Sequence, residues 1–510
     1  MYGAFIDYQK AFDLVDRSSL WSKLIGFGLN GKIFTVIYNL YLNAKSCVKS
    51  GYSTSEFFLC NIGVRQGENL SPLLFALFLN DFEQFVSKSY RGLNDLSNDF
   101  SNLLSDDDVE VFFRLFVLLY ADDTIVLAET PEELQKALDA VFLYCQTWKL
   151  NVNIGKTKIV IFSRGVVRNK PTFKFGDRNI EVCQDYVYLG STVNYNGSFM
   201  KAINKQVNQA RRALYSLKSK WAKLELPIDV QCELFDRMIM PIALYGCEIW
   251  GSAKIDQVNM FHKKFLKSLL RVGKSTANCM VLGELGRMTL EPTIHMRMLN
   301  FWIKIVTGKK TKLSFIMYQL MKKMHDEGIF KCKWITKVKG IIDSTGFSHV
   351  WHNINDINIR KFKKDIQLRL QDMARQDWSS EVHRNSLCTN YRLIKDTLEL
   401  EQPLLTLNFQ DRVSLTKFRC SNHNLPVSNN RFLGQEINYT CTLCNSIDVA
   451  DEYHFVLVCP ALRDERRRLI PRRFYQRPNV IMFKELFQIK DILALSNLAK
   501  FIRIIMGKFN

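Results

Sequence analysis

Over the first 165 residues, the pattern of apolar and polar positions changes repeatedly between short β-prone runs and helical spacing. Residues 2–8 form a short apolar, β-prone run. Apolar side chains at helical spacing then recur over residues 19–42, 70–85 and 131–148. Ser71 is placed to cap the second of these helices, with Pro72 at the first helical position. Short strands interleaved with helices predict an α/β or α+β layer domain.

A β-hairpin is predicted between the last two of these helices. Residues 111–119 and 124–128 are apolar, β-prone arms, and a Tyr-Ala-Asp-Asp turn that contains Asp122 and Asp123 joins them. Asp7 stands near the end of the first strand, so folding can bring it close to this turn. The pattern therefore offers three carboxylates from the ends of strands.

Beyond residue 194 the pattern changes to long amphipathic helices. Residues 202–224 and 230–244 are the clearest of them, and the pattern continues to about residue 299. The segment 301–415 is basic and mixed in character, and the last ~95 residues carry a cluster of Cys and His. The second half is thus expected to be mainly helical, with a small separate module at its end.

An excess of basic residues indicates polyanionic partners. Lys and Arg number 70 against 50 Asp and Glu, which gives a net charge of +20. Residues 303–340 hold ten lysines and two acidic residues. A second basic cluster consists of Arg463, Arg466, Arg467, Arg468, Arg472 and Arg473. Each cluster could also be an ordinary solvated helix face.

The cysteines and the apolar runs bear on the compartment. The 13 cysteines are odd in number and mostly isolated, and the N-terminus lacks the layout of a signal peptide, so we expect a reducing, intracellular compartment. The longest apolar runs fall far short of the ~20 residues that a membrane-spanning helix requires. No membrane segment is predicted.

Three clustered carboxylates repel one another unless a cation compensates their charge. Divalent metal is the usual solution, and two Mg²⁺ bridged by Asp7, Asp122 and Asp123 would suit an in-line phosphoryl transfer. The arrangement favours a nucleotidyl transferase. A Tyr-x-Asp-Asp sequence also occurs by chance in exposed turns, so this motif alone leaves both alternatives open.

Several further blocks occur in a fixed order along the chain. They lie at residues 5–13, 63–75, 120–123, 153–158, 188–190, 244–251 and 283–286. In these blocks the sequence resembles the reverse transcriptases of non-LTR (LINE-type) retrotransposons. The resemblance implies a right-hand polymerase palm, an antiparallel sheet with helices, and it covers most of the chain.

The resemblance implies roles for the acidic residues. Asp7 and Asp122 match the principal ligands of two catalytic Mg²⁺, and Asp123 supports the same site. Asp13, in the first block, is better explained as a helix-start or surface carboxylate than as a third ligand. The implied reaction is attack of a primer 3′-hydroxyl on the α-phosphate of a deoxynucleoside triphosphate.

The resemblance also implies residues that bind substrate. Phe12 matches the aromatic ring beneath the incoming sugar, where bulk excludes a 2′-hydroxyl and so disfavours RNA synthesis, although it could be an ordinary core residue. Gln66 and Gly67 match a loop that packs on the nascent base pair. Either Lys156 or Lys158 matches a basic position near the triphosphate, and the sequence does not distinguish them.

The C-terminal cluster has the spacing of a zinc site. The pattern C-x2-C-x9-H-x4-C is formed by Cys441, Cys444, His454 and Cys459. Four such ligands predict one structural Zn²⁺, the alternative being free thiols in a buried cluster. It resembles the C-terminal knuckle of non-LTR elements, which implies contact with template RNA or target DNA, with phosphate contacts from the downstream arginines. Cys420 and His423 nearby are interpreted as core or surface residues.

The resemblance implies a domain order and the partners. We expect a palm over 1–165 without the fingers that precede it in complete relatives, a primer-grip-like hairpin region over 166–200, a helical thumb over 201–300, a basic connector over 301–415 and a zinc knuckle with a basic tail over 416–510. RNA template, DNA primer or target and deoxynucleoside triphosphates are the expected partners, with a nuclear or cytoplasmic location. The alternative is a non-catalytic nucleic-acid-binding remnant of a truncated element.

Overall fold

The computed structural model describes residues 1–65, 67–88, 117–120, 123–163, 165, 167, 169–429, 440–446 and 448–509. These residues fall into two compact units. Unit 1 comprises Met1–Ala202 and Gly308–Cys332, and unit 2 comprises Ile203–Thr307 and Lys333–Asn510. Within the described ranges, no helix is both long enough and apolar enough to cross a membrane.

Unit 1 is built on a six-stranded mixed sheet with the order β6-β7-β1-β8-β10-β9. Its strands are β1 (Tyr2–Asp7), β6 (Val117–Tyr120), β7 (Asp123–Ala128), β8 (Lys158–Ile161), β9 (Phe173–Phe175) and β10 (Arg178–Cys183). β1 is antiparallel to both of its neighbours, β7 and β8, whereas β10 runs parallel to β8. The predicted first strand and the predicted β6–β7 hairpin are confirmed, and residues 111–116 of the hairpin prediction lie outside the described ranges.

Helices of unit 1 match the periodic segments with two interruptions. They are α1 (Arg17–Gly26), α2 (Gly31–Leu42), α3 (Ser71–Phe78), α4 (Phe82–Ser87), α7 (Pro131–Thr147) and α15 (Leu313–Asp326). The predicted helical stretch 19–42 is divided because Gly28 and Gly31 adopt φ of +82° and +64° between α1 and α2. The stretch 70–85 is divided after Phe78.

Ser71 does not cap its helix, so that prediction is wrong. Ser71 is the first residue of α3, and Leu70 is the N-cap without a side-chain bond. The Ser71 side chain is fully buried, and its Oγ lies 3.2 Å from the hydroxyl of Tyr41. A hydroxyl that is engaged inside the core is not available to the free amides at the helix start.

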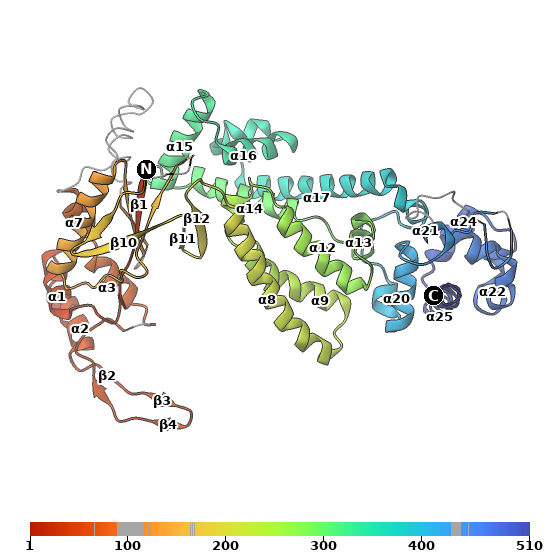
Figure 1. Cartoon of the computed structure of the whole chain (residues 1–510), viewed down its shortest axis with the longest axis horizontal. Helices are drawn as coiled ribbons and strands as arrows, with labels where there is room; N and C mark the ends of the chain where they lie inside the picture. Colours follow the sequence, from red (N-terminus) through yellow and green to blue (C-terminus); the bar gives the residue numbers. More distant parts are fainter. Residues whose placement is uncertain are drawn as a thin grey trace. The chain divides into compact units, whose positions relative to one another are not determined.

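The two faces of the sheet are covered by different layers (Figure 1). Ala4 and Ile6 are buried in the core that the sheet shares with α1, α3 and α7. Phe5 faces the other way and stacks on Tyr186 with ring centroids 4.5 Å apart. Tyr186 belongs to a hairpin of β11 (Asp185–Tyr188) and β12 (Ser191–Asn194). Since side chains alternate along a strand, Asp7 shares the face of Phe5.

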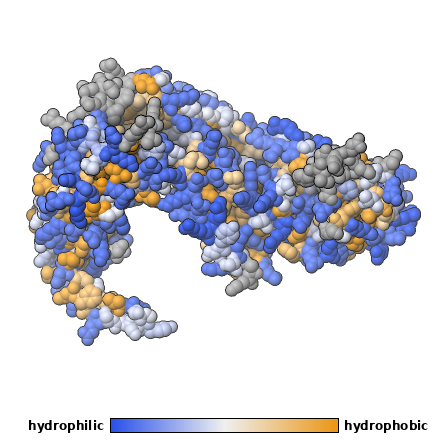
Figure 2. All heavy atoms as spheres, viewed as in Figure 1, coloured by the Kyte–Doolittle hydropathy of each residue, from blue (hydrophilic) through white to orange (hydrophobic). Residues whose placement is uncertain are grey.

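Residues 43–62 form a narrow arm that extends from the body of unit 1 (Figure 1). It consists of two short strand pairs, β2 (Lys45–Ser46) with β5 (Phe58–Leu59) and β3 (Lys49–Ser50) with β4 (Ser53–Thr54). All eight strand residues are exposed, as are Tyr52 near the tip and Phe57. Figure 2 shows apolar side chains at the base of this arm. The arm therefore adds little to the core of unit 1.

Unit 2 is mainly helical in the part that the structure describes. Its longer helices are α8 (Met200–Leu224), α9 (Ile228–Leu234), α12 (Asp256–Leu270), α13 (Asn278–Glu284), α14 (Glu291–Val306), α16 (Lys333–Ser344), α17 (Ile359–Arg384), α20 (Phe409–Arg419), α22 (Arg463–Leu469), α24 (Val480–Phe487) and α25 (Ile492–Gly507). Shorter ones are α10 (Met240–Ala243), α11 (Cys247–Trp250), α18 (Tyr391–Ile394), α19 (Pro403–Thr406), α21 (Pro426–Asn429) and α23 (Arg472–Tyr475). The predicted amphipathic helix over 202–224 is confirmed as α8.

The predicted helix over 230–244 is confirmed with an irregularity. A π-helical turn at Phe235–Ile239 separates α9 from α10. Pro241 follows directly in α10, and a proline has no amide hydrogen to donate to the preceding turn. A wider turn is one way in which a helix accommodates this missing donor.

A buried lysine joins three helical segments of unit 1. The ammonium of Lys23 on α1 donates to the carbonyl oxygen of Phe78 at 2.7 Å, to the hydroxyl of Tyr144 at 2.6 Å and to Asp81 Oδ1 at 2.5 Å. It also lies 4.0 Å from the ring centroid of Trp148. Burial lowers the pKa of Lys23, and the bond to Asp81 opposes that effect. Asp81 lies in the break between α3 and α4, so the bond to Lys23 ties this break to α1.

Replacing Lys23 with Met should destabilise unit 1. The substitution leaves the Asp81 carboxylate and the Tyr144 hydroxyl without their ammonium partner, which should lower the free energy of unfolding by about 2–3 kcal/mol. Urea unfolding monitored by tryptophan fluorescence measures it. Lys32→Met, on an exposed position of α2, is the matched control. Equal stability of the two variants would contradict the assigned role of Lys23.

Candidate functional site

The pairing of β1 with β7 places two of the predicted acidic residues opposite each other. Asp7 and Asp123 are the last partners in the antiparallel register that begins at Tyr2 and Ala128. Both lie on the face that carries Phe5, because each is two positions from a residue of that layer. Directly opposed residues have Cβ atoms about 4.5–5.5 Å apart, so two carboxylates here can share a cation. Asp122 lies outside the described residues.

The backbone of Asp7 is fixed by the block at 153–158. Its amide donates to Oγ1 of the buried Thr157 at 3.2 Å, and its carbonyl accepts from the amide of Asn153 at 2.8 Å. The amides of Lys156 and Thr157 both donate to the carbonyl of Asn153, which makes this block a tight turn. The turn brings Nζ of Lys156 to 3.9 Å from Oδ2 of Asp7.

The two candidate lysines of this block have different surroundings. Lys156 is exposed and lines the pocket in front of Asp7. Lys158 lies in β8, paired in register with Phe5, and its ammonium is 2.7 Å from Oε2 of Glu181. The structure therefore separates the two residues that the sequence leaves equivalent: Lys156 is close to Asp7, and Lys158 is engaged with another carboxylate.

A pocket of about 400 Å³ opens in front of the first acidic residue. Its lining consists of Asp7, Tyr8, Gln9, Lys10, Ala11, Phe12, Asp13, Asn153 and Lys156. Phe12 is half-buried, and its ring centroid lies 4.8 Å from that of Phe75 on α3. Phe12 thus packs on the core with one side while lining the pocket. Asp13 is exposed at the pocket wall, in keeping with a surface carboxylate.

The loop that carries the predicted base-pair contacts is anchored to the same block. The amide of Val64 donates to the carbonyl of Phe12 at 2.8 Å. Gly63 adopts φ of +80°, and a Cβ at this position would lie 2.4 Å from the carbonyl oxygen of Asp13, so only glycine fits. Gly67 adopts φ of +95° and is exposed. Gln66 lies outside the described residues.

Tyr186 is a site residue that the sequence reasoning missed. Burial, together with the charges of Asp7 and Asp123, raises the pKa of the Tyr186 hydroxyl to about 12. The phenol therefore lies within electrostatic reach of both carboxylates and stays protonated at neutral pH. The alternation of β11, in which Tyr186 and Tyr188 both reach the Phe5 layer, was the available signal. Using this signal would have required knowing which face of the sheet the hairpin covers.

The Cys/His cluster of unit 2 converges in space. One ligand atom from each of Cys441, Cys444, His454 and Cys459 lies within 4.8 Å of the others. The Sγ atoms of Cys441 and Cys459 are 3.9 Å apart, and Nε2 of His454 is 3.5 Å from Sγ of Cys444. Three sulfurs and one imidazole at this spacing are compatible with a tetrahedral zinc site.

Burial shifts pKa values within this cluster, and a carboxylate lies close to the histidine. It raises the pKa of Cys459 to about 12 and lowers the pKa of His454. Neutral imidazole suits metal binding, whereas a neutral thiol must lose its proton to bind. Nδ1 of His454 is buried and lies 4.0 Å from Oδ2 of Asp448, the position of a supporting carboxylate.

One residue of the downstream arginine cluster has a structural role. Arg466 is buried and donates to the carbonyls of Val456 at 2.7 Å, Phe455 at 3.1 Å and Cys459 at 2.9 Å. These carbonyls belong to the π-helical turn His454–Val458 and to the last metal-type ligand. The expectation that Arg466 contacts phosphate is therefore wrong, because its guanidinium closes this turn. The other five arginines of the cluster are exposed.

Cys420 and His423 belong to the core, which is one of the two interpretations that the sequence allows. Cys420 is 2% exposed, and Nε2 of His423 lies 2.9 Å from Oε1 of the buried Glu452. The His423 contact and the Ser421 hydroxyl hold the pKa of Glu452 at about 2, against the opposing effect of burial. Neither Cys420 nor His423 belongs to the cluster of four ligands.

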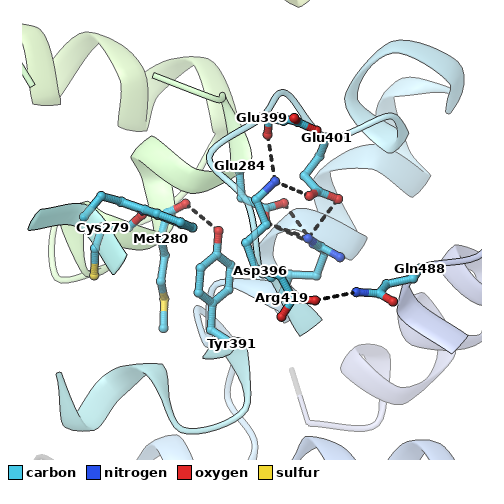
Figure 3. A network of polar contacts seen from close by, with 11 residues as sticks. Cys279, Met280, Glu284, Tyr391, Asp396, Glu399, Glu401, Arg419 and Gln488 are labelled. Atoms are coloured by element: carbon cyan, nitrogen blue, oxygen red, sulfur yellow. Dashed lines mark hydrogen bonds and ion pairs between the residues drawn. The ribbon is translucent and has the colours of Figure 1, made fainter. Parts of the chain in front are cut away.

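The block at 283–286 holds a buried ion-pair network (Figure 3). Nε of Arg419 donates to both carboxylate oxygens of Glu284 at 3.0 Å, and its Nη2 lies 2.9 Å from Oε2 of Glu401. Lys395 pairs with the other oxygen of Glu401. Glu284 and Arg419 are almost fully inaccessible to solvent. Both charges are thus compensated inside unit 2.

The glycines of this block permit the network. A Cβ on Gly283 would lie 2.3 Å from the hydroxyl of Tyr391, and one on Gly286 would lie 2.3 Å from the amide nitrogen of Leu400. Gly286 also adopts φ of +61°. Close backbone approach therefore explains why glycines flank Glu284, and the block stabilises the fold of unit 2.

Comparison with known proteins connects unit 1 to polymerases. Residues 1–193 match the family described as "Reverse transcriptase (RNA-dependent DNA polymerase)". The chain is 23% identical over 277 residues to the "RNA-directed DNA polymerase from mobile element jockey" of Drosophila funebris, covering 52% of this chain and 28% of that protein.

Two further relatives are of the same kind. The jockey protein of Drosophila melanogaster is 26% identical, covering 53% of this chain and 28% of that protein. The "Retrovirus-related Pol polyprotein from type-1 retrotransposable element R2" of Popillia japonica is 27% identical, covering 38% and 30%. The matched segments span less than a third of these relatives.

The electrostatic link between Tyr186 and the acidic pair can be measured directly. In Asp7→Asn the loss of one nearby negative charge should lower the pKa of Tyr186 from about 12 towards 10, while burial keeps it above 10. NMR titration of chains labelled at the tyrosine Cζ, with Tyr186→Phe for assignment, follows this change. Asp177→Asn, in the exposed turn between β9 and β10, should leave it unaltered. Identical pKa values in both aspartate variants would refute the proximity.

Proposed function

We propose that this chain is a reverse transcriptase of a non-LTR retrotransposon and catalyses RNA-directed DNA synthesis, since its residues 1–193 match the reverse transcriptase family. The observation that carries the proposal is the register of β1 and β7, which opposes Asp7 and Asp123 beside a pocket. The substrates are deoxynucleoside triphosphates, an RNA template and a DNA primer at the target, so synthesis would be target-primed.

The acidic residues fit the metal that reverse transcriptases use. Asp7, Asp122 and Asp123 would hold two Mg²⁺, since carboxylate oxygens are the ligands that this hard cation prefers. When bound, the ions polarise the phosphate and lower the pKa of the primer hydroxyl. Asp7 is 26% exposed, so it is accessible to ions and substrate while its backbone is held by Thr157 and Asn153.

Residues around the pocket would orient the nucleotide. Lys156, whose ammonium lies 3.9 Å from Asp7, would balance the triphosphate charge. Its neighbour Lys158 forms an ion pair with Glu181. Phe12, held between Phe75 and the pocket, would lie beneath the sugar and exclude a 2′-hydroxyl. Gln66 and Gly67 would contact the nascent base pair, where the exposed glycine lets backbone approach closely.

The primer-grip region, the thumb and the zinc knuckle would contact nucleic acid. The proposal assigns residues 1–165 to a palm, 166–200 to a primer-grip region, 201–300 to a thumb, 301–415 to a connector and 416–510 to a zinc knuckle with a basic tail. The hairpin of β11 and β12 supports the second assignment, because it covers the face on which Asp7 lies. One Zn²⁺ would be held in the last segment by Cys441, Cys444, His454 and Cys459.

Primer extension tests the polymerase proposal. On an RNA template annealed to a DNA primer, with Mg²⁺ and deoxynucleotides, the full chain should extend the primer. Asp123→Asn should reduce the rate at least ~100-fold, because a neutral amide is a poor ligand for the cation. Asp177→Asn is the matched control for the loss of one exposed carboxylate in unit 1. Absence of extension by the parent chain would favour the non-catalytic binding remnant.

Metal content and stability test the zinc proposal. The purified chain should contain one Zn²⁺, and Cys444→Ser should lose it and melt at a lower temperature. Cys47→Ser, a half-exposed cysteine of unit 1, should retain the metal. Acidification should release the ion, because protons compete with the metal for the sulfurs. Mass spectrometry of metals across pH provides the readout, and equal zinc in both cysteine variants would overturn the assignment.

A further inference from the structure

Three cations of unit 2 lie close enough to interact with one another. Lys218 on α8, Arg271 at the end of α12 and Arg412 on α20 come from three separate elements. Arg271 and Arg412 lie over the ring of Phe409, with guanidinium carbons 5.9 Å and 5.6 Å from its centroid. The Phe409 side chain is 55% exposed. We refer to Lys218, Arg271 and Arg412 with this ring as the basic cluster.

The cations of the basic cluster have no acidic partner among the described residues. None of them has a carboxylate oxygen within 4.0 Å there. Burial lowers the pKa values of Lys218 and Arg412, and the nearby positive charge of Arg271 lowers both further. The neighbouring Asp411 is buried and pairs with Arg503 at 3.2 Å, so it does not serve Arg412. Like charges held together repel, and an anion would relieve that repulsion.

The position of Arg271 is fixed by its surroundings. It is the left-handed C-cap of α12, with φ of +57°. The ammonium of Lys267 donates to the carbonyls of Lys274 at 2.7 Å and Thr276 at 2.6 Å, and the amide of Gly273 donates to Oδ1 of Asn422 at 2.8 Å. These bonds attach the loop after α12 both to its own helix and to the end of α20. The cluster is therefore a preformed feature.

We propose that the basic cluster binds the phosphodiester backbone of a nucleic-acid strand. Guanidinium groups match phosphate oxygens in pairs, and three cations from separate elements can follow successive phosphates. Arg271 and Arg412 lie over an exposed ring, and Lys218 is held by the hydroxyl of Ser268 at 2.8 Å. An exposed ring beside cations suits a passing strand better than a single enclosed nucleotide. The partner is a nucleic acid, as in the proposed function on which this inference rests. Binding at the basic cluster would require neither metal nor catalysis.

Salt-dependent binding tests the proposal. Fluorescence anisotropy with a labelled 20-base-pair mixed-sequence DNA duplex is measured from 50 to 300 mM NaCl without Mg²⁺ or nucleotides, so failure of polymerase activity does not affect the result. Arg271→Gln/Arg412→Gln should weaken binding, and the slope of log affinity against log salt should fall in magnitude by about 1.5–2, at about 0.9 per lost phosphate contact. Arg360→Gln/Arg369→Gln, two exposed arginines of α17, is the matched control.

Three results would overturn the proposal. One is an unchanged slope in the Arg271→Gln/Arg412→Gln variant. Another is an equal fall in the Arg360→Gln/Arg369→Gln control, which would indicate only the loss of net charge. The third is displacement of the duplex by inorganic phosphate or a free deoxynucleoside triphosphate at matched ionic strength, which would indicate a small-anion site. Circular dichroism melting of both variants confirms that the fold is kept.

Discussion

The antiparallel register between β1 and β7 is the constraint on which the candidate site depends. Side chains alternate with a period of two along a strand, so a slip of one residue would turn every side chain of β1 to the other face. Ile6 would then face the Tyr186 layer, and Asp7 would be directed into the helix-covered core. The burial of Ala4 and Ile6 against the helices therefore places the acidic residue on the open face.

Unit 2 depends on a different kind of constraint. Glu284 and Arg419 are 135 residues apart in sequence, yet their charges are buried together and share Glu401. Removing one member of such a pair leaves an uncompensated charge in a low-dielectric interior, which is far more costly than removing both. The buried ion pair therefore joins the segment around α13 to the segment around α20.

Patterns local in sequence predicted the strands and helices well, whereas contacts between distant segments could not be predicted. Two-residue alternation identified β1 and the β6–β7 hairpin, and spacing alone indicated that Cys441, Cys444, His454 and Cys459 come together. The place of Tyr186 and the different surroundings of Lys156 and Lys158 depend on contacts with a distant hairpin or turn. Arg466 looked like a surface cation because its sequence neighbours are charged, and only the folded chain shows the carbonyls that it serves.

The arm at residues 43–62 has a consequence for the integrity of the chain. Exposed, weakly paired loops are the sites at which proteases cut most readily. β1 and α1 precede the arm in sequence and α3 follows it, yet all three contribute to one buried core. A chain cut within the arm would consequently run as two fragments under denaturing conditions while remaining a single particle in native buffer.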